Sequence, residues 1–264
     1  MEALLVPDFA TEAYDGLAPH YDAFTAGHDY DGWLGVLEAL AVEHGLRGQW
    51  LLDVGCGTGK SFLGMLERGY EVVACDLSPE MVARARNKVR GGRAEVLVAD
   101  MRDLPELGAF DLVTCTDDAM NYLLSGAELL DALHGFERNL RPGGVAIFDL
   151  NTLGTYRIWY AGTAAMDSEG AFFCIRGEAS AELEPGDTAS VWIEIFSPAP
   201  DDLWRRTRSR HVQRHHPRDE VEEAAAEAGL EVVAVRGYSG GLCLSAAPDE
   251  EVDSKFVYVA RKPA

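Results

Sequence analysis

Residues 49–152 alternate between short apolar runs and amphipathic segments. The apolar runs cover residues 50–54, 70–76, 94–100, 109–116 and 145–150, and such continuous apolarity is typical of strands buried on both faces. Between them, residues 60–69, 78–92 and 126–140 place apolar side chains at helical spacing. Strands that alternate with helices predict a parallel sheet covered by helices on both faces.

The pattern changes after residue 152. Residues 172–183, 189–197 and 203–214 alternate apolar and polar positions, and the turn sequences EPGD and SPAPDD separate them, which predicts antiparallel hairpins. Residues 218–230 then show a helical pattern, and residues 231–238 and 254–262 are apolar runs. They resume the alternation of buried strands and helices seen over residues 49–152. We therefore expect an α/β fold with an inserted small antiparallel β subdomain. The expected parts are an N-terminal helical cap (1–48), an α/β core (49–152 and 216–264) and the insert (153–215).

The first predicted strand leads into LLDVGCGTGKS, residues 51–61, which is rich in glycine. A phosphate-binding loop of the form GxxxxGK followed by Ser or Thr requires glycine where this chain has Val54. A dinucleotide-binding GxGxxG loop requires glycine where it has Lys60. We therefore expect neither kind of loop, and we expect Lys60 to be only the first turn of a helix.

Acidic residues recur where the predicted strands end. Asp76 ends the second strand, Asp100 ends the third, and Asp117 and Asp118 follow the fourth. Open α/β sheets bind ligands at the carboxyl ends of their strands. An ordered series of acids behind a glycine turn therefore predicts a ligand site at this edge of the sheet.

These stretches together resemble the class I S-adenosylmethionine-dependent methyltransferases. The matching segments are LLDVGCGTG, VVACDLSPEMV, VLVADMRDLP, FDLVTCTDDAMNYL and LRPGGVAIFDLNT, in the family's order over residues 50–152. The resemblance implies a Rossmann-like seven-stranded sheet and an enzyme that uses S-adenosyl-L-methionine and releases S-adenosyl-L-homocysteine. It implies no metal.

The resemblance also implies contacts with each part of the cofactor. The glycine loop approaches the methionine part, whose carboxylate faces the following helix N-terminus. Asp76 accepts hydrogen bonds from both ribose hydroxyls, and Asp100 accepts one from the adenine amino group. The full expected set is Tyr21, Tyr30, Asp53, Gly55, Cys56, Gly57, Gly59, Asp76, Leu77, Asp100, Met101 and Thr116.

Within the family, the layout looks most like bacterial small-molecule methyltransferases with a β-rich insert, including aminosugar N-methyltransferases of antibiotic pathways. The shared segments are YDAFTAGHDY, MNYL and SRHVQRHHPRDEV. In those enzymes a tyrosine aligned with Tyr21 and a histidine aligned with Tyr122 face the reacting amine. Because this chain has tyrosine at the second position, the acceptor atom stays open between nitrogen and oxygen, with nitrogen slightly favoured.

A nitrogen acceptor and an oxygen acceptor require different catalytic groups. An amine needs only its free lone pair, whereas a hydroxyl needs a general base. His211, on the last strand of the insert, is the best-placed base, and its alternative is a histidine paired within a sheet. Tyr21, Tyr122 and His211 are thus the expected catalytic residues. His211 and His215 would lie about 13 Å apart along a strand, so we expect no shared metal.

The expected acceptor-binding residues follow the fourth and fifth strands or lie on the insert, and they are Asn121, Asn151, Tyr156, Trp159 and Arg208. Arg206, Arg208 and Arg210 share one face of their strand. That face is either a solvated surface or a contact with an acidic substrate group.

Composition narrows the function classes further. The net charge of −21 disfavours binding to nucleic acid, and the five cysteines form no CxxC pair that would suggest zinc. The N-terminal residues show no basic leader, and no apolar run reaches membrane-spanning length. We expect a cytoplasmic enzyme, monomeric or homo-oligomeric, with a small-molecule acceptor and no nucleic-acid or membrane partner. The alternatives are an O-methyltransferase, a non-catalytic cofactor-binding scaffold, and methylation of a protein side chain.

Overall fold

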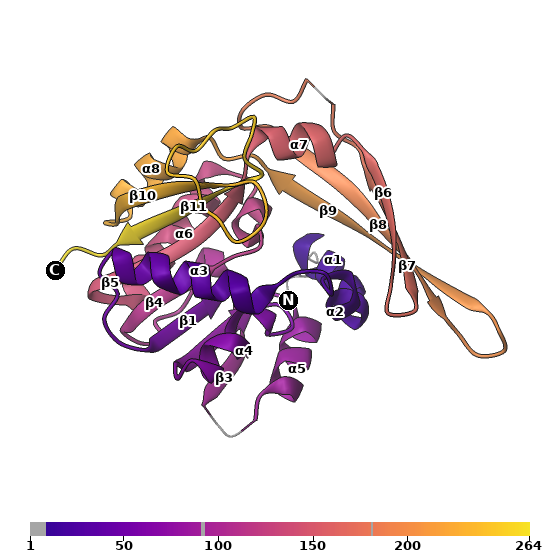
Figure 1. Ribbon diagram of the computed structural model, residues 1–264, viewed down its shortest axis with the longest axis horizontal. Coiled ribbons are helices and arrows are strands. Elements are labelled where there is room, and N and C mark those ends of the chain that lie inside the picture. The colour runs from indigo at the N-terminus through magenta and orange to yellow at the C-terminus, as the bar shows by residue number, and fades with distance from the viewer. Residues whose placement is uncertain (1–8, 91–92, 181) are drawn as a thin grey trace, which may run out of the picture.

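A seven-stranded sheet forms the centre of the computed structural model, which describes residues 9–90, 93–180 and 182–264 (Figure 1). The strand order is β10-β11-β5-β4-β1-β2-β3, in which β1 to β5 are parallel and β11 is antiparallel to both neighbours. The predicted Rossmann-like sheet is thereby confirmed. Its strands are β1 (Trp50–Val54), β2 (Glu71–Asp76), β3 (Ala94–Val98), β4 (Phe110–Cys115), β5 (Leu140–Asn151), β10 (Glu231–Tyr238) and β11 (Lys255–Arg261).

Helices bury their apolar sides on both faces of this sheet. One face carries α3 (Tyr30–Glu43), α4 (Lys60–Glu67) and α5 (Pro79–Lys88), and the other carries α6 (Gly126–Asn139) and α8 (Arg218–Glu227). At the start of α5, the Ser78 hydroxyl accepts a hydrogen bond from the Met81 amide at 3.1 Å, the N-cap that the sequence predicts. Within the described residues, no helix is both long and apolar enough to cross a bilayer.

A second, antiparallel sheet projects from this body (Figure 1). It consists of β6 (Thr163–Ser168), β7 (Ala171–Gly177), β8 (Thr188–Pro198) and β9 (Trp204–Arg214). The predicted hairpins are confirmed, but β6 and the preceding helix α7 (Leu153–Trp159) were not expected. The sequence of β6, TAAMDS, has no run of β-branched or aromatic residues, so it carries no clear strand signal.

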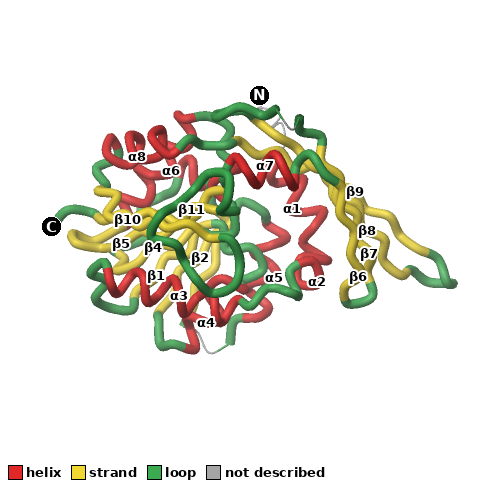
Figure 2. The backbone as a smooth tube through the Cα atoms, turned by 45° about the horizontal axis from the view of Figure 1, so that its top comes forward, coloured by secondary structure: helices red, strands yellow, loops and turns green. Residues whose placement is uncertain are grey.

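Short N-terminal helices lie between the two sheets (Figure 2). They are α1 (Phe9–Leu17) and α2 (Tyr21–Phe24), joined by a 3₁₀ turn over Ala18–His20. Leu17 packs in the same apolar cluster as Val191 and Ile193 of β8. Lys60 donates from Nζ to the carbonyl oxygens of Asp22 (3.1 Å) and Thr25 (3.3 Å). This lysine therefore does more than open α4, because it also ties α2 to the glycine loop.

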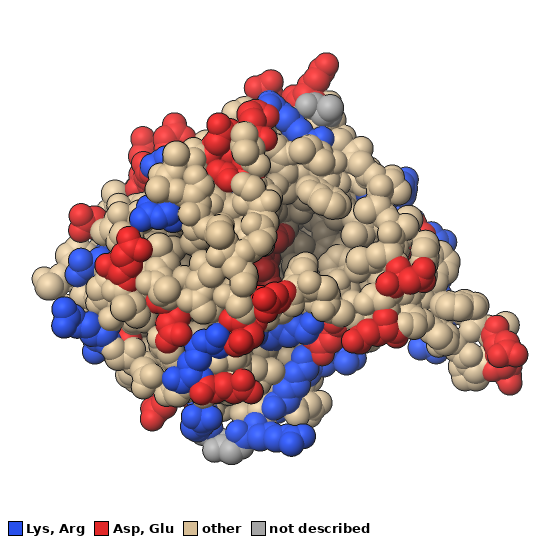
Figure 3. Space-filling model, in the orientation of Figure 1, with Lys and Arg blue, Asp and Glu red and all other residues tan. Residues whose placement is uncertain are grey.

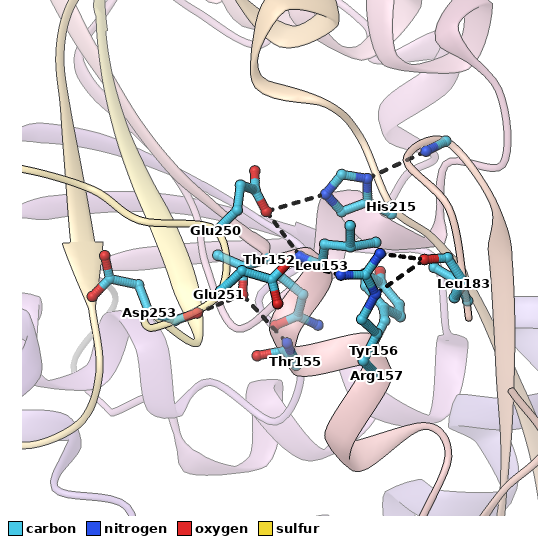
Figure 4. A network of polar contacts seen from close by, with 12 residues as sticks. Thr152, Leu153, Thr155, Tyr156, Arg157, Leu183, His215, Glu250, Glu251 and Asp253 are labelled. Carbon is cyan, nitrogen blue, oxygen red and sulfur yellow. Dashed lines mark hydrogen bonds and ion pairs between the residues drawn. The ribbon is translucent and has the colours of Figure 1, made fainter. Parts of the chain in front are cut away.

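Polar contacts join α7, the loop between β10 and β11, and the second sheet (Figure 4). The Leu153 amide donates to Oε2 of Glu250 at 2.9 Å, and Nε2 of His215 lies 3.4 Å from the same oxygen. The Arg157 guanidinium donates to the carbonyl oxygen of Leu183 at 3.0 Å. His215 therefore takes part in this junction, away from His211.

Candidate active site

Two adjoining cavities lie where β1, β2 and β4 end. The first is lined by the glycine loop, the end of β2, and aromatic residues of the N-terminal helices: Ala10, Tyr14, Tyr21, Tyr30, Gly55, Cys56, Gly57, Lys60, Ser61, Asp76, Leu77, Ser78, Met101, Thr116, Asp117, Ala119 and Tyr122. The second extends under the antiparallel sheet and is lined by Tyr14, Leu17, Tyr21, Phe24, Thr25, His28, Asp117, Asp118, Tyr122, Trp159, Tyr160, Ile175, Val191, Ile193, His211, Gln213 and Lys255. Both walls include Tyr14, Tyr21, Asp117 and Tyr122.

The glycine loop requires glycine for conformation and for space. Gly55 has φ +71°, and a Cβ there would lie 2.9 Å from the Ala119 Cβ. Gly59 has φ +93°, and a Cβ there would lie 3.1 Å from the Phe62 ring. Side chains are therefore disfavoured at both positions. The backbone of Gly57 faces the first cavity directly.

Asp76 stands at the end of β2 and holds the loop in place. Its carboxylate accepts hydrogen bonds from the amides of Gly57 (2.8 Å) and Ser78 (2.9 Å). Burial raises the pKa of Asp76, although these amide hydrogen bonds partly offset the rise. Leu77 and Met101 line the same cavity. A carboxylate between apolar side chains is suited to a ribose beside a purine ring.

Asp53 and Asp100, two other expected cofactor residues, lie outside the lining of the first cavity. The Asp53 carboxylate sits behind the glycine loop, where it accepts hydrogen bonds from the hydroxyls of Ser61 (2.5 Å) and Thr114 (2.7 Å), and burial raises its pKa to about 7. Neither Asp53 nor Asp100 is among the described residues that line the first cavity. Asp100 pairs instead with Arg102, with 2.6 Å between Oδ2 and Nη2. Any contact of Asp100 with adenine would have to share the carboxylate with this guanidinium.

The wall shared by the cavities is built from tyrosines. Tyr14 of α1 lies against Tyr122 and His211, with ring centroids 5.1 and 5.4 Å apart. Tyr30 donates its hydroxyl to Oδ2 of Asp117 at 2.8 Å. Burial raises the pKa of Tyr21 well above its ordinary value, so its hydroxyl stays protonated. Tyr14 was not expected from the sequence, although the spacing of Ala13 and Leu17, which are both buried, would have indicated the helix that carries it.

His211 faces the second cavity with both ring nitrogens engaged. Nδ1 lies 2.9 Å from the Tyr122 hydroxyl, and Nε2 lies 2.9 Å from the Ser209 hydroxyl. Burial lowers the pKa of His211 to about 4. The imidazole is therefore neutral near pH 7 and is a weak base.

A cluster of charges lies beside the two cavities, and it joins Asp117 and Asp118, which the sequence places at this edge of the sheet, to Asp149 and Lys255, which the sequence analysis did not assign to the site. Asp117 and Asp118 adopt left-handed backbone conformations, with φ +59° and +55°. Their amides donate to the buried Asp149 carboxylate at 2.9 and 2.7 Å, and Nζ of Lys255 lies 3.2 Å from Asp118 and 3.5 Å from Asp149. Burial raises the pKa of Asp149 to about 6, against the effect of Lys255. Burial alone lowers the pKa of Lys255, but the surrounding carboxylates raise it above its ordinary value, so this lysine stays charged.

Most of the expected acceptor-binding residues lie behind the cavity wall. Asn121 donates to the Arg214 carbonyl oxygen at 3.0 Å and accepts from the Asn151 amide at 2.9 Å. Tyr156 donates its hydroxyl to the same Arg214 carbonyl oxygen at 3.0 Å. Gln213 was missed, yet it faces the second cavity and donates to Oδ2 of Asp118 at 2.6 Å. Its sequence signal is that it shares strand parity with His211.

The structure places the other two expected acceptor-binding residues, Trp159 and Arg208, in different surroundings. Trp159 lines the second cavity. Arg208 does not: its guanidinium lies over the Trp192 ring at 3.4 Å, with 41% of its side chain exposed. Odd-numbered residues of β9 face the cavity and Arg208 lies on the outer face, which favours a solvated surface over a substrate contact for this residue.

Comparisons with known proteins agree with this arrangement. Residues 51–144 match the family model described as a methyltransferase domain. The putative methyltransferase YqeM of Bacillus subtilis is 29% identical over 83% of this chain and 87% of its own length. The dTDP-3-amino-3,6-dideoxy-alpha-D-glucopyranose N,N-dimethyltransferase of Streptomyces fradiae is 28% identical over 81% of this chain and 83% of its own.

Among solved structures, a S-adenosylmethionine-dependent methyltransferase from Clostridium acetobutylicum has a TM-score of 0.78 and 23% identity, covering 95% of this chain and 99% of its own. The likeness extends over both sheets, since so little of either chain is left out. The motif order, the glycine loop with Asp76 behind it, and the matched domain converge on one family. Residues 51–144 are therefore a methyltransferase domain, and the chain has the fold of an S-adenosylmethionine-dependent methyltransferase.

Proposed function

We propose that this enzyme methylates a nitrogen atom of a small-molecule metabolite and works in natural-product biosynthesis. The first cavity holds S-adenosyl-L-methionine, and the second holds the acceptor. The insert, residues 153–215, forms the lid over the acceptor, and helices α1 and α2 of the N-terminal region form the cap between the two ligands.

The residues of the first cavity fit the cofactor. A Cβ at Gly57 would point toward Tyr21 at 3.7 Å from Cε1, so the bare loop leaves open the space that faces the ring. In the proposal, Asp76 binds the ribose hydroxyls, while Leu77 and Met101 pack on the adenine. When bound, the cofactor supplies an electrophilic methyl group on a sulfonium.

The shared tyrosine wall is the observation that carries the proposal. Tyr14, Tyr21 and Tyr122 line both cavities, so an acceptor in the second cavity meets the cofactor at these rings. Methyl transfer is an in-line displacement, and holding the two reactants in line supplies much of the acceleration. The ring faces also stabilise the positive charge near the methyl group.

The state of His211 favours nitrogen over oxygen as the acceptor atom. Its pKa of about 4 and its two occupied nitrogens make it a poor base for removing a hydroxyl proton. An amine in its neutral form attacks through its lone pair, and the proton that an ammonium loses beforehand can pass directly to water, so no strong base is needed. His211 instead orients the Tyr122 hydroxyl. The name of the Streptomyces fradiae relative, an aminosugar N,N-dimethyltransferase, supports the same choice.

The test is the position of the new methyl group. The purified enzyme is incubated with S-adenosyl-L-methionine and pairs of small amines and matching alcohols, and products are analysed by tandem mass spectrometry. We expect N-methyl products. Tyr21→Phe and Tyr122→Phe should lower kcat on the order of 10- to 100-fold, whereas Tyr70→Phe, in the core cluster beside α4, should not. Products methylated only on oxygen would refute the proposal, and cofactor binding without any product would favour the scaffold alternative.

A further inference from the structure

We infer that the acceptor is a cationic amine without a phosphate group, recognised by Asp117 and Asp118. The inference rests on the proposed function, and it concerns the charge and chemical class of the acceptor.

A third cavity extends the second one toward the surface. It lies beside the loop between β10 and β11, and Asp29, Trp33, Asp117, Tyr238 and Lys255 are in its wall. Figure 3 shows this face hollowed, with acidic atoms on the inner wall of the hollow. The second and third cavities together thus form a path from the surface to the tyrosine wall.

Acidic groups dominate this path. Asp29, Asp117 and Asp118 line it, and Lys255 is the sole lysine or arginine among its described lining residues. The segments outside the described part of the chain contain neither lysine nor arginine in their sequence. Phosphate groups are bound in proteins mainly by arginine, lysine and helix N-termini.

Lys255 already forms ion pairs with carboxylates of this chain. Its Nζ lies 3.2 Å from Asp118, 3.5 Å from Asp149 and 3.9 Å from Asp117. A diphosphate placed beside it would face three carboxylates at the same time. This is a departure from the Streptomyces fradiae relative, whose named sugar carries dTDP.

Asp117 stands where the reaction takes place. It lines all three cavities, and 30% of its side chain is exposed. The bound ammonium first loses one proton to solvent past the Asp117 carboxylate, which frees the nitrogen lone pair. In methyl transfer the S–CH₃ bond then breaks, its electron pair stays on sulfur, and the nitrogen lone pair forms the new N–CH₃ bond. Positive charge thus moves from sulfur to nitrogen, and the methylated product is an ammonium ion. A carboxylate at this junction stabilises the charge in its new position.

The remaining lining of the second cavity indicates the shape and polarity of the rest of the acceptor. Leu17, Phe24, Ile175, Val191 and Ile193 line it opposite the acids. A molecule that fits has an apolar side and an ammonium group at the Asp117 end.

Binding of simple probes tests the charge preference. Enzyme loaded with S-adenosyl-L-homocysteine is titrated calorimetrically with 2-phenylethylamine, its neutral counterpart 2-phenylethanol, and thymidine diphosphate. We expect the amine to bind at least about tenfold more tightly than the alcohol, which corresponds to about 1.4 kcal/mol, and thymidine diphosphate to show no saturable binding at this site. Asp117→Asn with Asp118→Asn should abolish the preference, since asparagine also tolerates the left-handed backbone. Asp131→Asn, which removes one exposed negative charge on α6, should leave it intact.

Three results would overturn the inference: equal affinity for amine and alcohol, a preference that survives in the double variant, or thymidine diphosphate that displaces the amine. Product analysis separates this failure from that of the proposed function. Methylation on the nitrogen of a nucleotide-linked aminosugar would refute the charge inference and leave the N-methyltransferase proposal standing. Methylation on oxygen alone would refute the proposed function.

Discussion

Burial of His211 predicts a specific pH dependence of stability. Its side chain is enclosed between the hydroxyls of Tyr122 and Ser209, and burial lowers its pKa to about 4. In the unfolded chain the same imidazole has its ordinary pKa of about 6.5. The perturbation is His211→Asn, whose amide oxygen lies near the position of Nδ1 and can still accept from the Tyr122 hydroxyl.

The direction in which the free energy of unfolding changes with pH follows from proton binding to the folded and unfolded chains. Between pH 6.5 and 4 the unfolded chain binds a proton at His211 that the folded chain does not bind, so the free energy of unfolding falls as the pH falls. The loss is about 1.4 kcal/mol per pH unit, or about 2 kcal/mol between pH 7 and pH 5. The variant lacks this loss and should therefore be less sensitive to acid than the wild type by that amount.

Urea unfolding of both proteins at pH 7, 6 and 5 measures the difference. Asp53 and Asp149 have pKa values that burial raises to about 7 and about 6, so they bind protons earlier in the folded chain and act in the opposite direction. They are present in both proteins and cancel in the comparison, as does any constant loss from the smaller side chain. Parallel pH profiles for the two proteins would show that His211 is not held neutral, and the argument for a nitrogen acceptor would lose its basis.

Further predictions concern the cofactor site and the outer face of the second sheet. Asp76→Ala removes hydrogen bonds to a charged acceptor worth about 1.5–3 kcal/mol each, so calorimetry should show cofactor affinity reduced at least about 100-fold; near-normal affinity in a folded variant would exclude the ribose role. Gly55→Ala should cost about 1–3 kcal/mol of unfolding free energy in urea, more than Gly143→Ala, which has φ +77° and nothing within 4 Å. Equal losses would mean that the contact with Ala119 is unimportant. Arg208→Ala should leave kcat/KM unchanged, and a large fall would return this residue to the acceptor site.

The fold was largely predictable because its core elements carry strong local signals. The strands of the main sheet are apolar runs between glycine turns and amphipathic helices, and Ser78 with Pro79 marks the start of α5. The elements that the sequence did not predict, α7 and β6, are short, and β6 is an edge strand of the second sheet. Their positions are set by contacts distant in sequence, such as that of Leu153 with Glu250.

The candidate site was predictable where a motif fixes the backbone, and less so where packing decides. The glycine loop and Asp76 lie where the pattern indicates. Strand parity placed Arg208 correctly on one face of β9, but sequence does not tell which face is covered. Lys255 and Tyr14 reach the site from opposite ends of the chain, and no local pattern joins them.

The buried amides between the two sheets have a consequence for the evolution of new specificity. Asn121 and Asn151 bind the end of β9, with 3.1 Å between Nδ2 of Asn151 and Oε1 of Gln213. Substitutions that remove one partner while the junction stays buried would leave these groups without a hydrogen bond, at a cost of about 1–3 kcal/mol each. The roof of the acceptor site is thus stiff, and mutations there risk the whole fold. Phe24, on a short helix and only partly buried, is a position at which selection or engineering can reshape the acceptor range at lower cost.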